Sequence, residues 1–218
     1  MLKSLDKANS NNLVYTSAGD RSNLEYWLNG KKNFDLWVTY YGDKRNKYID
    51  LSDYYHERKG TKFPNLLYCY QNHREIIDQY DAILVLDDDI IFCGYDIEKL
   101  FDLRKKYDLW LLGPTFDPTG KVSFSCTIAR PFASLRFNNF VEMNVPLFRK
   151  DKLDIFMDVF DPTVTGWGSD AWYLHILGDK VENKIALSDE VYCLNPLDKA
   201  KGGKREIDRY QSKNERIK

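Results

Sequence analysis

The chain has 218 residues, of which 43% are apolar and 30% are charged, and its formal net charge is −1. This length and composition are typical of a folded globule with one large or two small domains, which excludes a disordered or collagen-like chain. A nearly neutral chain has no overall field that attracts polyanions, so we expect no nucleic-acid partner.

Apolar segments alternate with helical patterns through the first half of the chain. After a polar lead over residues 1–11, the sequence predicts strands at residues 12–17, 34–41, 82–86 and 109–112. It predicts helices at residues 24–28, 64–80 and 96–107. This alternation predicts an α/β fold with a layered sheet and right-handed crossovers.

The second half is less regular. Residues 123–148 are expected to be extended, 150–160 to form an amphipathic helix, about 170–177 a further helix, and 185–187 a late strand. Without a linker or an internal repeat, one domain over residues 1–218 is favoured. The tail at 198–218 has eight Lys and Arg against four Asp and Glu, a net of +4, and is expected to be mobile or to act as a solvated basic segment.

No signal peptide and no apolar run of about 20 residues is present, so no membrane segment and a cytoplasmic location are expected.

Three polar segments follow predicted strands. They are Gly19-Asp20, Gly42-Asp43 and Asp87-Asp88-Asp89. Ligands of α/β sheets bind at the carboxyl ends of the strands, where Gly19, Asp20 and Asp43 would lie near a nucleoside. A carboxylate there can accept from a base N–H or from ribose hydroxyls, although Asp beside Gly is equally typical of a plain turn.

The acidic run at 87–89 follows a buried strand, where adjacent carboxylates repel one another unless a cation neutralises them. Oxygen ligands favour Mg²⁺, Mn²⁺ or Ca²⁺. Side chains alternate along a strand, so Asp87 and Asp89 form the expected metal-binding pair. An acidic turn that caps a helix is the structural alternative. An EF-hand is excluded, because Ile91 and Phe92 stand where a ligand and a glycine are required.

Two motifs carry a resemblance to a known fold family. Residues 83–89 resemble the D-x-D strand end of GT-A glycosyltransferases, and residues 165–170 resemble their G-W-G-x-D segment. The chain also resembles a poorly characterised family of glycosyltransferases, in which these segments recur in the same order with those at 34–43 and 139–148. The resemblance spans roughly residues 12–210.

The resemblance implies a GT-A-like, Rossmann-related fold with a mixed, mainly parallel sheet flanked by helices. It implies transfer of a sugar from a nucleotide-sugar, with a UDP-sugar as the expected donor, to a carbohydrate or lipid-linked hydroxyl. It also implies a role in surface polysaccharide synthesis. The implied cofactor is Mn²⁺ or Mg²⁺ on Asp87 and Asp89.

Further site residues are expected around this centre. Asp170 is the candidate base, and helix capping is the alternative explanation for it. The tail is expected to close over the donor diphosphate through Lys201, Lys204 and Arg205. The residues expected on the acceptor side are Glu142, Trp167, Gly168 and Trp172.

One departure from the family pattern leaves other functions open. Many GT-A enzymes supply a late histidine to the metal, but residues 191–196 contain none, so Cys193, Asn195 or a water molecule would take its place and metal binding would be weak. A protein of the same fold that binds nucleotides or sugars without catalysis is one alternative. A Mg²⁺-dependent phosphohydrolase with Asp87 as nucleophile is the other, although Ile90-Ile91 departs from the pattern of such enzymes.

Overall fold

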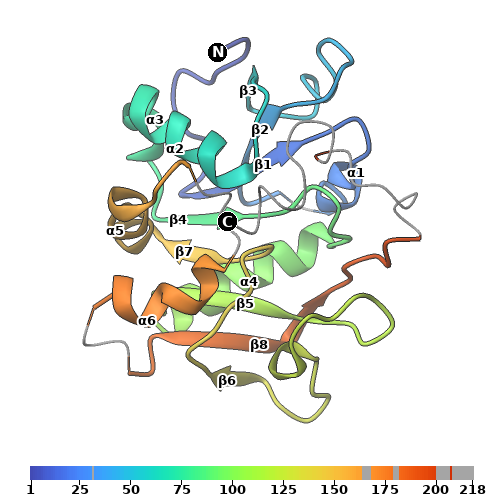
Figure 1. Ribbon diagram of the computed structural model, residues 1–218, viewed down its shortest axis with the longest axis vertical. Helices are drawn as coiled ribbons and strands as arrows, with labels where there is room; N and C mark the ends of the chain where they lie inside the picture. Colours follow the sequence, from blue (N-terminus) through green and yellow to red (C-terminus); the bar gives the residue numbers. More distant parts are fainter. Residues whose placement is uncertain (31, 164–167, 179–181, 200–206, 208–218) are drawn as a thin grey trace.

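The computed structural model describes residues 1–30, 32–163, 168–178, 182–199 and 207 (Figure 1). Eight strands of this part of the chain form one sheet in the order β3-β2-β1-β4-β7-β5-β8-β6. Their bounds are β1 (Asn12–Ala18), β2 (Asp35–Tyr40), β3 (Tyr54–Glu57), β4 (Ala82–Val85), β5 (Leu111–Phe116), β6 (Leu135–Phe137), β7 (Leu147–Arg149) and β8 (Ile185–Cys193). β7 is antiparallel to β4 and β5, β6 is antiparallel to β8, and the other pairs are parallel. The predicted α/β class with a mixed, mainly parallel sheet is confirmed.

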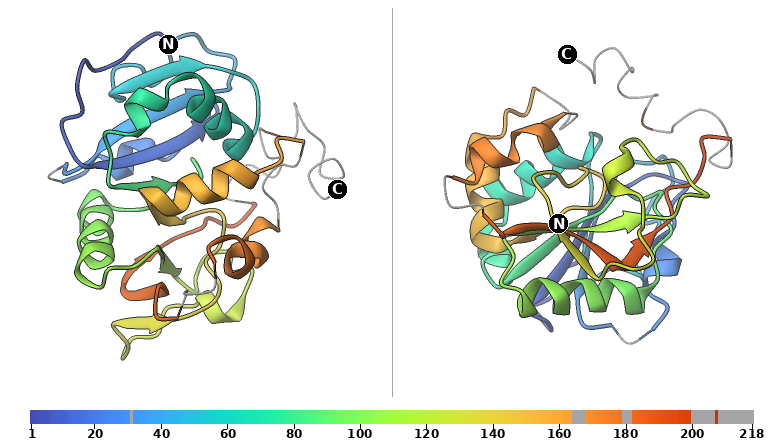
Figure 2. Two further views of the ribbon diagram at one scale, coloured as in Figure 1. Left: turned by 90° about the vertical axis from the view of Figure 1, so that its left-hand side faces the viewer. Right: turned by 90° about the horizontal axis from the view of Figure 1, so that it is seen from below.

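Helices cover both faces of the sheet, as the side views in Figure 2 show. They are α1 (Leu24–Trp27), α2 (Lys62–Asn72), α3 (Arg74–Ile77), α4 (Gly94–Lys106), α5 (Lys150–Val159) and α6 (Tyr173–Ile176), with 3-10 turns η1 (Ser125–Thr127) and η2 (Ser169–Trp172). α1 and α4 pack on the face that carries Val14 and Leu84, and the other α-helices pack on the face that carries Tyr15 and Val85. Strands enclosed on both faces are apolar at consecutive positions, which made β4 recognisable from sequence. No helix of the described residues is long and apolar enough to cross a membrane.

Two strands run further than predicted. β5 begins at Leu111 rather than at residue 109 and continues to Phe116, while β8 continues to Cys193. Along this length β5 pairs in parallel with β8, and the register shifts between Pro114 and Thr115. Proline cannot donate to a ladder and is tolerated at such an irregularity. Pairing between distant segments therefore extends both strands through residues with weak local preference for a strand.

Other boundaries also differ from the prediction. β3 was not predicted, yet Tyr54 and Tyr55 in it are fully buried and it pairs with β2. The helix predicted at 64–80 is two helices, α2 and α3, because the chain leaves helical geometry at His73 with φ −145°. The helix predicted from Asp96 begins at Gly94, and that predicted from about Asp170 is η2 followed by α6.

A buried histidine in β3 makes the fold sensitive to acid. His56 is 6% exposed, its Nδ1 accepts from Trp37 Nε1 at 3.3 Å, and its Nε2 lies 3.4 Å from the Thr39 hydroxyl. Burial, together with the nearby positive charge of protonated His73, lowers the pKa of His56 to about 4. The folded protein therefore favours the neutral ring.

We expect this preference to appear as a loss of stability in mild acid. The ring titrates near 6.5 when unfolded, so its contribution is complete above that pH and is lost as the pH falls through about 4. The shift corresponds to about 3 kcal/mol. In urea unfolding at a series of pH values, the unfolding free energy of His56→Gln should change less between these limits than that of the wild type. The same pH slope in both proteins would contradict the assignment.

Candidate functional site

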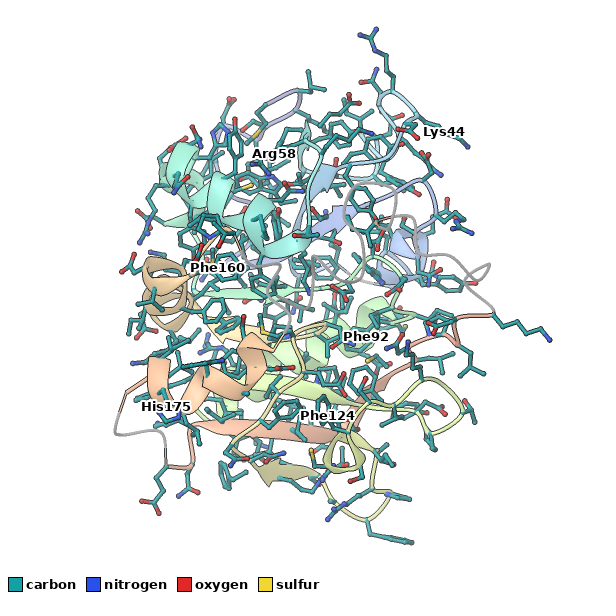
Figure 3. All side chains as sticks on the ribbon, viewed as in Figure 1. Lys44, Arg58, Phe92, Phe124, Phe160 and His175 are labelled. Atoms are coloured by element: carbon teal, nitrogen blue, oxygen red, sulfur yellow. The ribbon has the colours of Figure 1, made fainter. Side chains whose placement is uncertain are left out.

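The carboxyl ends of β1, β2 and β4 meet at one edge of the sheet, because β1 pairs in parallel with both of the others. The amide of Gly19, just after β1, donates to Asp88 Oδ2 at 2.8 Å, and the amide of Asn23 donates to the Asp88 carbonyl at 2.7 Å. Figure 3 shows Lys44, which follows β2, on this side of the molecule and His175 of α6 far from it. The structure thus brings together the three polar segments predicted to bind a nucleotide.

The Asp20 carboxylate is fixed by β2 and the loop that follows. The Tyr40 hydroxyl donates to Asp20 Oδ1, and the amide of Asp43 donates to Oδ2 at 3.2 Å. Burial acts to raise the pKa of Asp20, but these bonds and the amide of Lys44 outweigh it, and the pKa is lowered. Asp43 itself lies 2.8 Å from Lys59 Nζ. Asp20 is therefore an ionised acceptor held in one position.

A lysine ammonium group neutralises the first carboxylate of the acidic run. Lys62 Nζ lies 2.6 Å from Asp87 Oδ1 and donates to the main-chain oxygens of Met143 at 2.6 Å and Val85 at 3.3 Å. The Lys62 side chain is only 10% exposed. Burial lowers the pKa of Lys62, while the carboxylates at 87–89 act in the opposite direction. The ammonium thus has an acceptor for each of its three protons. Its charge offsets part of the repulsion predicted among the carboxylates of residues 87–89.

A short segment before β7 connects this edge to Asp170. The Asp87 amide donates to the carbonyl of Asn144 at 2.8 Å. Glu142 is 4% exposed, and its Oε1 accepts from the Thr127 hydroxyl at 3.0 Å. Burial raises the pKa of Glu142; bonds from Thr127 and Asn144 oppose this, and the charges of Asp170 and Asp87 raise it further. Two carboxylates from distant parts of the sequence therefore both act on the buried Glu142 carboxyl group.

Asp170 lies in η2, half-buried against the same segment. Its carboxylate accepts from the amides of Met143 and Ala171 and from its own amide, which lowers its pKa, but burial is the larger effect and the pKa is raised. The cap position of η2 is Gly168, which has φ +81°, so Asp170 is inside the turn rather than at its cap. A carboxylate with a raised pKa is better matched to proton abstraction near neutral pH than an ordinary one.

The remaining acceptor-side candidates are only partly described. A Cβ on Gly168 would meet no atom within 4 Å, and Trp172 is 60% exposed, with its ring 6.3 Å from that of His175. Trp172 therefore offers an accessible aromatic face rather than a core contact. The candidates outside the described residues are Trp167, Lys201, Lys204 and Arg205.

The described carboxylates form no ready-made metal site. No group of three or more His, Cys, Asp or Glu side chains in this part of the chain is arranged to hold a metal ion. Of the pair predicted to bind it, Asp87 is occupied by Lys62. Cys193 is a poor replacement for the late histidine, because burial, followed by the charge of Glu142, raises the pKa of its thiol, and the thiolate is the ligand form. Asn195, the other residue considered in place of the histidine, is 4% exposed and therefore buried.

Sequence reasoning missed Lys62 and Thr127. Lys62 is the first residue of α2, two positions before the predicted helix. A helix that connects parallel strands begins near the carboxyl ends of those strands, so a lysine just before such a helix could have been recognised as a counter-ion for Asp87. Thr127 had no such signal, because its contact with Glu142 depends on the path of an irregular segment.

No family model matches the chain, and no curated protein matches it in sequence. Its fold is similar to that of TarS from S. aureus. The crystal structure of TarS 1-349 gives a TM-score of 0.57 at 12% identity, over 85% of this chain and 60% of that one. TarS 1-349 in complex with UDP-GlcNAc gives 0.58 at 12% identity, over 89% and 59%. A197 from STIV gives 0.51 at 11% identity, over 84% and 83%. The chain spans about three fifths of the TarS 1-349 structure, and these similarities establish a shared fold.

Proposed function

We propose that the protein is a glycosyltransferase that moves a sugar from a nucleotide-sugar to a hydroxyl group of a carbohydrate or lipid-linked acceptor. The proposal rests on one observation: the segment at residues 142–144 carries Glu142 and bonds to both Asp87 and Asp170, beside the sheet edge where α/β folds bind nucleotides. The fold supports it, because TarS 1-349 has been crystallised with UDP and with UDP-GlcNAc. A UDP-sugar is therefore the proposed donor, and synthesis of a surface polysaccharide in the cytoplasm is the proposed role.

The nucleoside would bind over the ends of β1 and β2. Asp20 is the proposed acceptor for a base N–H or for ribose hydroxyls, since its carboxylate is ionised and held by Tyr40. Asp43 and the main chain at Gly19 lie on the same edge and complete this side of the proposed site. The basic tail, with Lys201, Lys204 and Arg205, is proposed to bind the diphosphate.

The leaving diphosphate requires positive charge close to the acidic run. Lys62 supplies such a charge at a fixed position, and we propose that this charge stabilises the donor diphosphate from nearby, since the three protons of the ammonium already have acceptors within the protein. A divalent cation, when bound, would also neutralise the diphosphate. Asp89 is the carboxylate proposed to hold Mn²⁺ or Mg²⁺, because Asp87 can join it only if Lys62 leaves.

Asp170 is proposed to activate the acceptor. Its carboxylate would take the hydroxyl proton while the acceptor oxygen bonds to the anomeric carbon and the bond from that carbon to the diphosphate breaks. Glu142 is 4% exposed and its Oε1 already accepts from the Thr127 hydroxyl, so it is proposed to support the site and is second to Asp170 as a candidate for the base. The exposed face of Trp172 is the proposed stacking surface for an acceptor sugar.

The metal assignment predicts a specific loss in one aspartate variant. Asp89→Asn should weaken Mn²⁺-dependent UDP binding, measured by calorimetry, by roughly tenfold to a hundredfold, since a charge-assisted contact is lost. The matched control is Asp88→Asn, which removes the same charge but can still accept from Gly19. Equal effects of the two changes, or no effect of Asp89→Asn, would remove Asp89 from metal binding.

A thermal-shift panel of nucleotides, nucleotide-sugars and phosphate esters, each with and without Mn²⁺, tests the proposed function against its alternatives. A glycosyltransferase should be stabilised by one nucleoside diphosphate and its sugars, because only ligands of the native state raise the midpoint. Release of the diphosphate from the stabilising donor would then exclude a protein that only binds it. Hydrolysis of phosphate esters without any nucleotide preference would favour the phosphohydrolase.

A further inference from the structure

A second charged site lies at the opposite edge of the sheet. A cavity of about 430 Å³ opens there, lined by Tyr80, Asp81, Arg104, Lys105, Asp108, Arg149, Lys150 and Asp151. Asp81 precedes β4 and Asp108 precedes β5, whereas the donor residues follow their strands. The cavity is therefore separated from the proposed donor site by the length of the strands.

Arg104 is the unusual member of this lining. It lies on α4 and is 8% exposed, yet no carboxylate among the described residues forms an ion pair with it within 4.0 Å. Its Nε is buried without a hydrogen-bond partner in this part of the chain, and its Nη1 reaches only the Leu109 carbonyl, at 3.5 Å. A buried guanidinium group normally has a carboxylate or phosphate partner, because burying an unpaired charge is costly.

Two of the three neighbouring carboxylates are engaged elsewhere. Asp108 bonds to Lys184 and lies 3.2 Å from Arg149, and Asp151 lies 2.6 Å from Arg149. Asp81 is exposed and makes no ion pair within the described chain. Burial lowers the pKa of Arg104 and the charge of Arg149 lowers it further, while the charges of Asp108, Asp81 and Asp151 act in the opposite direction.

We propose that this cavity binds a phosphate group, free or as a phosphate monoester, through the Arg104 guanidinium. The Nε–H and an adjacent Nη–H can donate together to two oxygens of one phosphate. Within the described chain, Nε has no hydrogen-bond partner and Nη1 has only the long contact to Leu109. The lining has four cations against three carboxylates. Arg149 is paired with Asp108 and Asp151, and Lys150 with Asp78 and Asp154, so Lys105 is the cation of the lining that adds to Arg104. The ligand would give the buried Arg104 guanidinium a partner and would stabilise the fold.

Thermal unfolding in phosphate and in chloride of equal ionic strength tests this site. Wild type should gain roughly 5 °C at a phosphate concentration a hundredfold above Kd. Arg104→Met should fold, because it removes a buried unpaired charge, and should lose this gain while binding UDP as wild type does. Arg130→Met is the matched control, since it removes an exposed arginine outside the cavity and should keep the gain.

A second measurement identifies the group involved. The Arg104 Nε–H signal in a ¹H–¹⁵N spectrum should move on titration with inorganic phosphate, and glucose 1-phosphate in place of phosphate would reveal whether a monoester binds more tightly. An equal gain in wild type and Arg104→Met, or an Arg104 signal unmoved by both ligands, would overturn the proposal. If the wild type does not bind UDP, the proposed glycosyltransferase function is contradicted, but the proposal of a phosphate site at Arg104 is not.

Discussion

Replacing Asp170 with asparagine is expected to lower kcat for sugar transfer by about two to four orders of magnitude while donor affinity stays near that of the wild type. The amide can still accept hydrogen bonds from Met143 and Ala171, so the turn should keep its shape. It cannot take a proton from the acceptor. The measurement is release of nucleoside diphosphate from the stabilising donor, with binding followed separately by calorimetry.

The pH profile gives a second test of the same assignment. Burial raises the pKa of Asp170, so the wild-type rate should fall with acid at a higher pH than an ordinary aspartate would require. Asp158→Asn is the matched control, because it makes the same chemical change at an exposed position on α5. A rate above a tenth of wild type in Asp170→Asn would remove Asp170 as the base and leave Glu142 as the next candidate.

Replacing Lys62 with methionine should make donor binding depend on metal. In EDTA the variant should bind UDP roughly tenfold to a hundredfold more weakly than the wild type, because a fixed positive charge close to the diphosphate is lost. With Mn²⁺ the affinity should recover, since Asp87 is released from the ammonium and can join Asp89. The wild type should respond less to Mn²⁺ than the variant does.

A lysine in another ion pair provides the control. Lys99→Met removes the partner of Glu190, 3.0 Å away at the surface of α4, and should leave UDP binding unchanged with and without metal. If Lys62→Met binds UDP like the wild type in EDTA, the charge of Lys62 does not stabilise the diphosphate. If the variant fails to recover with Mn²⁺, the two aspartates do not form the metal pair.

The parts of the fold that could be predicted are those whose pattern is local. β4 is apolar on both faces and is followed, after Leu86, by three aspartates, so its position and its edge follow from residues 82–89 alone. β3 begins with two tyrosines and has no alternating apolar pattern; it exists because it pairs with β2. When a strand forms mainly because it pairs with another strand, the local sequence does not predict its position.

The same distinction applies to the candidate site. The carboxylates at the strand ends were predictable because parallel neighbours share an edge. The contact of Lys62 with Asp87 joins residues 25 positions apart through a helix start, and the Met143 amide reaches Asp170 from a different loop. Such contacts depend on how irregular segments pack, and the sequence pattern contains no period that predicts them.

The central claim is that a nucleotide-sugar binds at the edge formed by β1, β2 and β4. An NMR titration of the ¹⁵N-labelled protein with UDP tests it most directly. The account predicts saturable movement of the amide signals of Gly19, Asp43 and Asp88, with little change in those of Asp108 and Asp151 at the opposite edge. Movement confined to that opposite edge, or no movement with any nucleoside diphosphate, would contradict it.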